Sequence, residues 1–243
     1  MIQVSARPMP LPRLAITSGT IEALKWLALV LMMGDHINKY LLNDTEAWLY
    51  CAGRLAMPLF MFVLAYNLAR PGALERGVYR RTMIRLAIFG ALASPAFLAL
   101  GGLVNGWWPL NILFTLFVLT ATLRFLEIRS LPGYLAAAAA FGLGGSLVEF
   151  WWPAIAFGIA IWSYTKFPSI AAMVLAAGSC AALGYINGNQ WALPSIFIIL
   201  TASVVDLPCP RVRWFFYGFY PAHLSLICLA RIPLRQAGYL FFT

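Results

Sequence analysis

The chain has 243 residues, of which 62% are hydrophobic, 15% are aromatic and only 10% are charged. Soluble domains are about 45–50% apolar and about 25% charged, so this composition excludes an ordinary soluble protein and indicates a polytopic integral membrane protein. The net charge of +9 would favour nucleic acid as the partner of a soluble protein. In a membrane protein the same excess is typical of cytoplasmic loops, and no nucleic-acid partner is expected.

Hydrophobic runs and the breakers between them predict an all-α bundle of about nine transmembrane helices, with eight or ten as alternatives. Residues 1–20 precede the first run and are predicted to form a cytoplasmic N-terminal extension. Residues 21–243 are predicted to be a single transmembrane domain. In chain order, the expected spans lie near residues 22–42, 48–69, 79–101, 108–126, 132–149, 152–165, 168–186, 190–206 and 213–231.

The segments between these spans alternate in charge. Most loop arginines and lysines fall on one side, whereas the other side receives neutral or mixed loops. Because Lys and Arg concentrate in cytoplasmic loops, the N-terminus is expected in the cytoplasm. The C-terminus departs from this pattern, since a ninth span leaves Arg231 and Arg235 outside. Either residues 239–242 re-enter the interface, or one of the middle spans is misplaced.

A few ionisable residues fall inside the predicted spans, where burial of a charge is costly and points to function. Both histidines of the chain, His36 and His223, belong to this group. Asp35 projects about 100° away from His36 on a helix, so we expect it to pair with Arg54 or to contact the substrate. The remaining candidates are Lys25, Asn38, Arg80, Arg81, Arg85, Glu149 and Tyr220. Interpretations without a functional role stay open for some of them. The side chains of Lys25, Arg80 and Arg81 can extend to the lipid headgroups, and Glu149 can be hydrated at the outer interface.

Lys25 and His36 are eleven residues apart, which is about three turns of helix and about 16 Å along its axis. Both side chains therefore project from nearly the same face. A cation near the cytoplasmic end can hold a phosphorylated group while the imidazole lies deeper in the membrane. This spacing suits a donor with phosphates at one end and a reactive group on a long arm, such as acyl-CoA.

Five stretches of the chain resemble the TraX family of conjugal-transfer membrane proteins, with TrbP-type members nearest. They are LKWLALVLMMGDHI, GRLAMPLFMFVLAYNLAR, RRTMIRLAIFG, LNILFTL and YGFYPAHLSLI. The resemblance covers about residues 21–231, and between roughly 130 and 210 it is one of hydropathy only. It implies a multi-pass protein of the bacterial inner membrane that transfers acetyl from acetyl-CoA to a conjugative pilin subunit.

The resemblance also implies roles for individual residues. A related superfamily of membrane acyltransferases carries a basic residue, ten further residues and a histidine, a pattern that Lys25 and His36 match. His36 is then the expected general base, with an acyl-imidazole as an alternative, and Asp35 and His223 are expected to assist it. The expected coenzyme-binding residues are Lys25, Arg80, Arg81 and Arg85. The expected substrate-binding residues are Arg54, Asn38, Asn111, Glu149 and Tyr220.

Two other classes of function remain open on the sequence alone. A transferase with a lipid or phosphoglycerol donor would use the same basic cluster for a phosphate headgroup. A non-catalytic pilus assembly factor or a transporter is the second alternative, although the inverted repeat that favours transport is not apparent. Four scattered cysteines without C-x-x-C spacing predict no metal site.

Overall fold

The computed structural model describes residues 11–101, 103–212 and 214–242, and over these ranges its regular elements are helices. Residues 1–10 of the predicted extension lie outside the described residues. The helices are α1 (Ser18–Leu41), α2 (Ala47–Gly53), α3 (Ala56–Ala69), α4 (Val78–Leu100), α5 (Ile112–Leu126), α6 (Leu131–Ala139), η1 (Ala140–Gly144), α7 (Gly145–Leu147), α8 (Trp151–Lys166), α9 (Ile170–Asn187), α10 (Pro194–Ala202) and α11 (Phe215–Gln236). The predicted all-α fold is confirmed for this part of the chain.

Local sequence explains where several helices begin. Thr17, Asn111, Ser130 and Ser169 precede α1, α5, α6 and α9, and each side chain accepts a backbone hydrogen bond from the first turn. Such caps satisfy N–H groups that have no partner within the helix. The boundaries of the predicted spans therefore coincide with helix boundaries to within a few residues.

The predicted count of about nine membrane spans is not supported by helix length and composition. Among the described residues, four segments are long and apolar enough to cross a membrane: Ala47–Ala69, Val78–Leu100, Ile170–Asn187 and Phe215–Gln236. A helix of nine residues such as α10 extends only about 14 Å, less than half of a hydrocarbon core about 30 Å thick. Helix α1 is long, but it carries Glu22, Lys25, Asp35 and Lys39.

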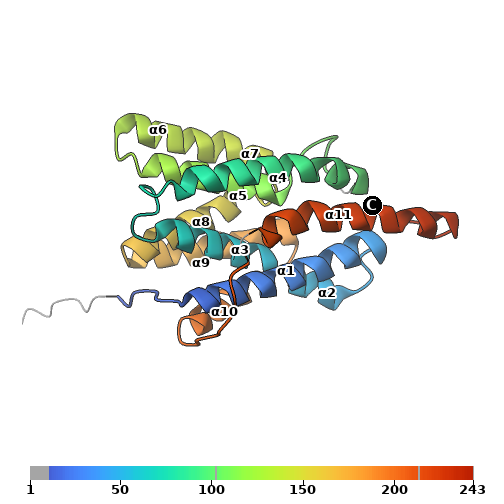
Figure 1. Ribbon diagram of the computed structural model, residues 1–243, viewed down its shortest axis with the longest axis horizontal. Helices are drawn as coiled ribbons and strands as arrows, with labels where there is room; N and C mark the ends of the chain where they lie inside the picture. Colours follow the sequence, from blue (N-terminus) through green and yellow to red (C-terminus); the bar gives the residue numbers. More distant parts are fainter. Residues whose placement is uncertain (1–10, 102, 213, 243) are drawn as a thin grey trace, which may run out of the picture.

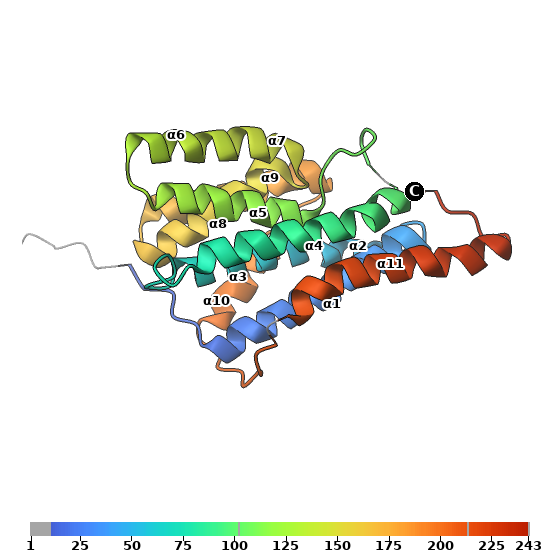
Figure 2. The same cartoon turned by 45° about the horizontal axis from the view of Figure 1, so that its top comes forward.

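The helices lie side by side along the long axis of the molecule, with α6 and α7 at one edge and α1 at the other (Figures 1 and 2). Contacts at their ends show that α1 and α11 run in the same direction. Lys25 of α1 lies over the ring of Phe216, and His36 further along α1 meets His223 further along α11. The two helices thus present their first turns at one end and their histidines toward the other.

Most basic loop residues gather at the end where α1 and α11 begin, which we call the basic end. There Arg70 donates a hydrogen bond to Ser18, 3.4 Å away. Lys166 pairs with Glu127, whose carboxylate also accepts from the Tyr79 hydroxyl at 3.1 Å. Loops that are distant in sequence are therefore joined at this end.

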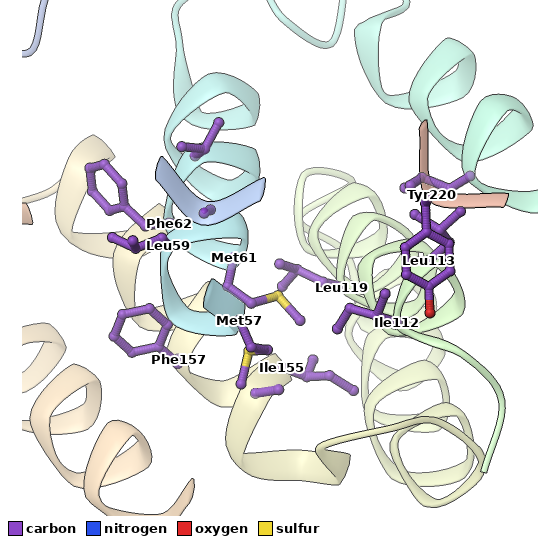
Figure 3. Close-up of a cluster of buried hydrophobic side chains, with 14 of the residues drawn as sticks. Met57, Leu59, Met61, Phe62, Ile112, Leu113, Leu119, Ile155, Phe157 and Tyr220 are labelled. Atoms are coloured by element: carbon purple, nitrogen blue, oxygen red, sulfur yellow. The ribbon is translucent and has the colours of Figure 1, made fainter. Parts of the chain in front are cut away.

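The core is centred on α3, where Leu59, Met61 and Phe62 have no solvent exposure. Figure 3 shows Met57 and Met61 of α3 among side chains of α5 and α8, including Leu119 and Ile155. Gly158 permits the close approach of α8 to α5, since a Cβ there would meet Leu119 Cδ1 at 2.7 Å. The apolar centre therefore fixes α3, α5 and α8 relative to one another.

The C-terminal segment is folded back rather than helical. Arg231 is 3% exposed, donates to the Leu100 carbonyl at 2.8 Å and stacks on Phe241. Asn43 bonds both the carbonyl of Leu240, at 2.8 Å, and the N–H of Phe242, at 3.1 Å. These contacts explain how an arginine is accommodated at the end opposite the basic end.

Candidate functional site

The two histidines of the chain form a hydrogen-bonded pair. Nδ1 of His36 lies 2.7 Å from Nε2 of His223, and Nδ1 of His223 lies 3.1 Å from the carbonyl oxygen of Phe219. A carbonyl only accepts, so Nδ1 of His223 carries the proton and its Nε2 is the acceptor. His36 therefore donates from Nδ1, and the lone pair on its Nε2 is available for proton transfer.

His36 lines a cavity of about 270 Å³ that extends from α1 to the loops at the end opposite the basic end. We call this the histidine cavity. Its polar and aromatic lining consists of Asp35, His36, Lys39, Tyr40, Asp44, Tyr50, Arg54, Phe60, Glu149, Phe150 and Tyr220. Four predicted site residues, Asp35, Arg54, Glu149 and Tyr220, thus join His36 in one cavity, although they come from four separate segments.

Asp35 pairs with Arg54 and not with the imidazole beside it in sequence. The guanidinium of Arg54 also donates from Nε to the Tyr50 carbonyl at 3.1 Å and lies 4.2 Å from the Tyr50 ring centroid. The expected Asp35–Arg54 pair is confirmed. Gly53 makes room for it, because a Cβ at that position would lie 2.6 Å from Asp35 Cγ.

Glu149 and Tyr220 also line the histidine cavity. Glu149 belongs to the loop between α7 and α8, and its carboxylate faces the backbone N–H of Ile112 at the start of α5. Burial raises the pKa of Glu149 to about 7. Tyr220 is buried, with its ring centroid 5.3 Å from His223 and 6.2 Å from His36.

Two predicted substrate-binding residues are used within the fold instead. Asn38 is fully buried, accepts from the Glu46 N–H at 2.9 Å and donates to Asp44 at 3.4 Å. Asn111 caps α5 and donates to the Gly90 carbonyl at 3.0 Å. Neither residue lines the histidine cavity, so their predicted contact with substrate gains no support from the geometry.

The predicted coenzyme-binding residues form a separate group at the basic end. Lys25 pairs with Glu22 at 2.6 Å. Arg85 stacks on Trp214, 4.3 Å from the ring centroid, while Arg80 and Arg81 are exposed at the start of α4. Because α1 is continuous from Ser18 to Leu41, Lys25 lies about 16 Å from His36 along the helix, as the spacing predicts.

Sequence reasoning missed Lys39, Tyr40 and Asp44 as members of the cavity. Lys39 is three residues after His36 and so lies on the same helical face, which is a signal that could have identified it. Tyr40 follows it with its ring centroid 5.6 Å from His36. Asp44 lies in a left-handed turn, with φ of 58°, and the local sequence pattern does not predict that its side chain lines the cavity. Within the described ranges, no group of three or more His, Cys, Asp or Glu side chains is arranged to hold a metal ion.

Comparison with known proteins gives a consistent match along most of the chain. The family model described as TraX protein matches residues 20–231. A protein of Escherichia coli named Protein TraX is 29% identical over 229 residues, which is 86% of each chain. Another Protein TraX, from Escherichia coli strain K12, is 35% identical over 122 residues, covering 50% of this chain and 45% of the relative. No solved structure matches.

Proposed function

The chain belongs to the TraX protein family, and from this premise and the geometry of the histidine cavity we propose that it is a membrane-embedded acyltransferase. It moves an acetyl group from acetyl-CoA to a conjugative pilin subunit in the bacterial inner membrane. The observation that carries the proposal is the hydrogen bond from Nδ1 of His36 to Nε2 of His223. That bond leaves Nε2 of His36 as a base in a cavity large enough for a small reacting group.

In this reaction Nε2 of His36 takes the proton from the acceptor nitrogen as that nitrogen attacks the acetyl carbonyl. The resulting imidazolium is stabilised by His223, whose Nε2 accepts its second N–H. His36 then returns the proton to the departing thiolate, which leaves an amide and a free thiol. General base catalysis of this kind contributes about 10²–10⁴-fold to rate.

The arginines of the basic end favour the proposal of a phosphorylated donor. Arg85 is held by stacking against Trp214 and Tyr217. Phosphate binding there therefore costs less side-chain conformational entropy. Arg80 and Arg81 are exposed on the preceding turn of α4, and arginine binds phosphate in a bidentate manner. A donor whose phosphate also contacts Lys25 has to extend about 16 Å along α1 to reach His36, a distance that suits the long arm of coenzyme A.

The test is acetyl transfer by the purified protein in lipid nanodiscs. Acetyl-CoA labelled in the acetyl group is supplied with the pilin subunit, and the modified pilin is weighed by mass spectrometry. The expected product carries one acetyl group, and His36→Ala removes it. Val30→Ala is the matched control, because Val30 is 55% exposed on the same helix. Undiminished transfer by His36→Ala would contradict the role of His36. A gain in pilin mass that corresponds to a phosphate-bearing group would contradict the acetyl donor and indicate a lipid donor.

A further inference from the structure

The histidine cavity contains more negative than positive charge. Its lining carries the two cations Lys39 and Arg54 and three carboxylates, those of Asp35, Asp44 and Glu149. Asp35 is neutralised by Arg54. A chamber with one excess carboxylate, placed in a low-dielectric surrounding, attracts a cationic ligand group.

Glu149 is a carboxylate of the cavity that has no ion-pair partner in the described part of the chain. Among the described residues, no lysine or arginine nitrogen forms an ion pair with it within 4.0 Å. Lys39, Arg54 and Asp35 act on it from greater distance, and the Ile112 N–H is its polar neighbour. An ionised carboxylate of this kind is costly to bury unless a ligand pairs with it.

The histidine cavity and the predicted coenzyme-binding residues at the basic end lie at different ends of the bundle. Asp44 and Glu149 belong to loops at the end opposite Lys25 and Arg85. His36 is positioned between them on α1. Two substrates can therefore approach one imidazole from opposite directions without competing for the same groups.

We propose that Glu149 is the acceptor-recognition residue: it pairs with the ammonium group of the incoming amine, which enters from the end opposite the basic cluster. This inference rests on the proposed acetyl transfer and adds a role for a specific residue and a direction of entry. A primary amine reaches the protein mainly as an ammonium ion, and an ammonium ion has no lone pair with which to attack.

Two protons must therefore leave the acceptor nitrogen. The Glu149 carboxylate takes the first, which converts the ammonium to a neutral amine and leaves a neutral carboxylic acid. The amine lone pair then forms the bond to the acetyl carbon while the carbon–sulfur bond breaks. His36 takes the second proton and passes it to the thiolate, so that charges and atoms balance. A hydroxyl acceptor would need His36 alone.

The experiment compares Glu149→Gln, Glu149→Asp and the control Glu46→Gln in nanodiscs. Glu46 is an exposed carboxylate at the same end of the molecule and does not line the histidine cavity. In Glu149→Gln, the KM for pilin is expected to rise about tenfold or more, as for loss of a buried charge pair, whereas the KM for acetyl-CoA stays unchanged. Glu149→Asp is expected to recover part of the loss. An unchanged KM for pilin, or an equal rise in both KM values, would overturn the inference.

A second measurement does not depend on transfer. A fluorescent peptide with the N-terminal sequence of the pilin is titrated onto the protein, once with a free amine and once with an acetylated amine. The original protein is expected to bind the free amine about tenfold more tightly, and Glu149→Gln is expected to bind both equally. Equal binding by the original protein would remove the role of Glu149 even if acetyl transfer were established. Preference for the free amine without any transfer would leave the recognition site intact and remove the proposed reaction.

Discussion

Nδ1 of His36 and Nε2 of His223 lie 2.7 Å apart, although 187 residues separate them in the chain. The Phe219 carbonyl fixes the tautomer of His223, and His223 in turn fixes that of His36. The Phe219 carbonyl therefore orients His223, His223 orients His36, and Nε2 of His36 keeps its lone pair. His223 is a positioning residue in this arrangement.

Substitution of His223 tests that order. His223→Ala is expected to lower kcat by about tenfold to a hundredfold, by analogy with loss of the partner that orients a metal-bound histidine. His223→Gln is expected to retain most activity, because its side-chain amide can present an acceptor where Nε2 lies. Steady-state kinetics of both variants check this. Ser225→Ala is the control on α11, since Ser225 is exposed and bonds only to the Pro221 carbonyl. Equal losses in the Ala and Gln variants would contradict the positioning role.

The sequence predicted some of these relationships and missed others for physical reasons. The helices follow from hydropathy and capping residues, which are local. The Asp35–Arg54 pair was predictable because the two residues fall at similar depth on consecutive predicted spans and because Asp35 projects away from His36. The contact of His36 with His223 depends on α11 packing beside α1, and no local pattern encodes that. The family resemblance predicts Asn111 as a substrate-binding residue, yet its side chain caps α5 and donates to the Gly90 carbonyl.

Gly53→Ala is expected to disturb the cavity and Gly178→Ala to be tolerated. A Cβ on Gly53 would lie 2.6 Å from Asp35 Cγ and 2.7 Å from its Oδ1, so Asp35 must move and its pair with Arg54 is strained. A Cβ on Gly178 meets no atom within 4 Å. We expect Gly53→Ala to lower the thermal midpoint and the transfer rate, whereas Gly178→Ala is neutral or slightly stabilising, as alanine usually is within a helix. Thermal unfolding in detergent measures both, and equal midpoints would show that Asp35 has room to shift.

The pH dependence of acceptor binding is expected to report on Glu149. Burial raises its pKa to about 7, so the carboxylate is mostly protonated at pH 6 and mostly ionised at pH 8. Only the ionised form pairs with an ammonium group, and the KM for pilin should therefore fall as pH rises through 7. The other charged and titratable groups that line the same cavity are Asp35, His36, Lys39, Tyr40, Asp44, Tyr50, Arg54 and Tyr220.

The comparison with Glu149→Gln isolates this effect from other titrations, including that of the histidine pair. Glutamine does not ionise, so the variant is expected to lose the fall in KM between pH 6 and 8 while any dependence of kcat persists. Parallel KM profiles for the two proteins would assign the pH dependence to a different group.

Two exposed loop residues can decide whether α5 crosses the membrane. Val104, between α4 and α5, is 72% exposed, and Ile128, between α5 and α6, is 55% exposed. If only the four long apolar segments cross, no crossing separates the two positions, and they lie on the same side of the membrane. If the shorter helix α5 also crosses, as the alternation of basic loops favours, they lie on opposite sides.

Cysteine labelling in intact cells distinguishes these two topologies. Val104→Cys and Ile128→Cys are introduced separately after Cys51, Cys180, Cys209 and Cys228 are replaced by alanine. A membrane-impermeant maleimide is expected to label Val104→Cys in intact cells and Ile128→Cys only after permeabilisation. Thr45→Cys and Glu75→Cys are the controls for the outer side and the basic end, because both residues are exposed in loops. Labelling of Val104→Cys and Ile128→Cys under the same condition would show that α5 does not cross. The histidine cavity would then have to be reached by the acceptor along a different route.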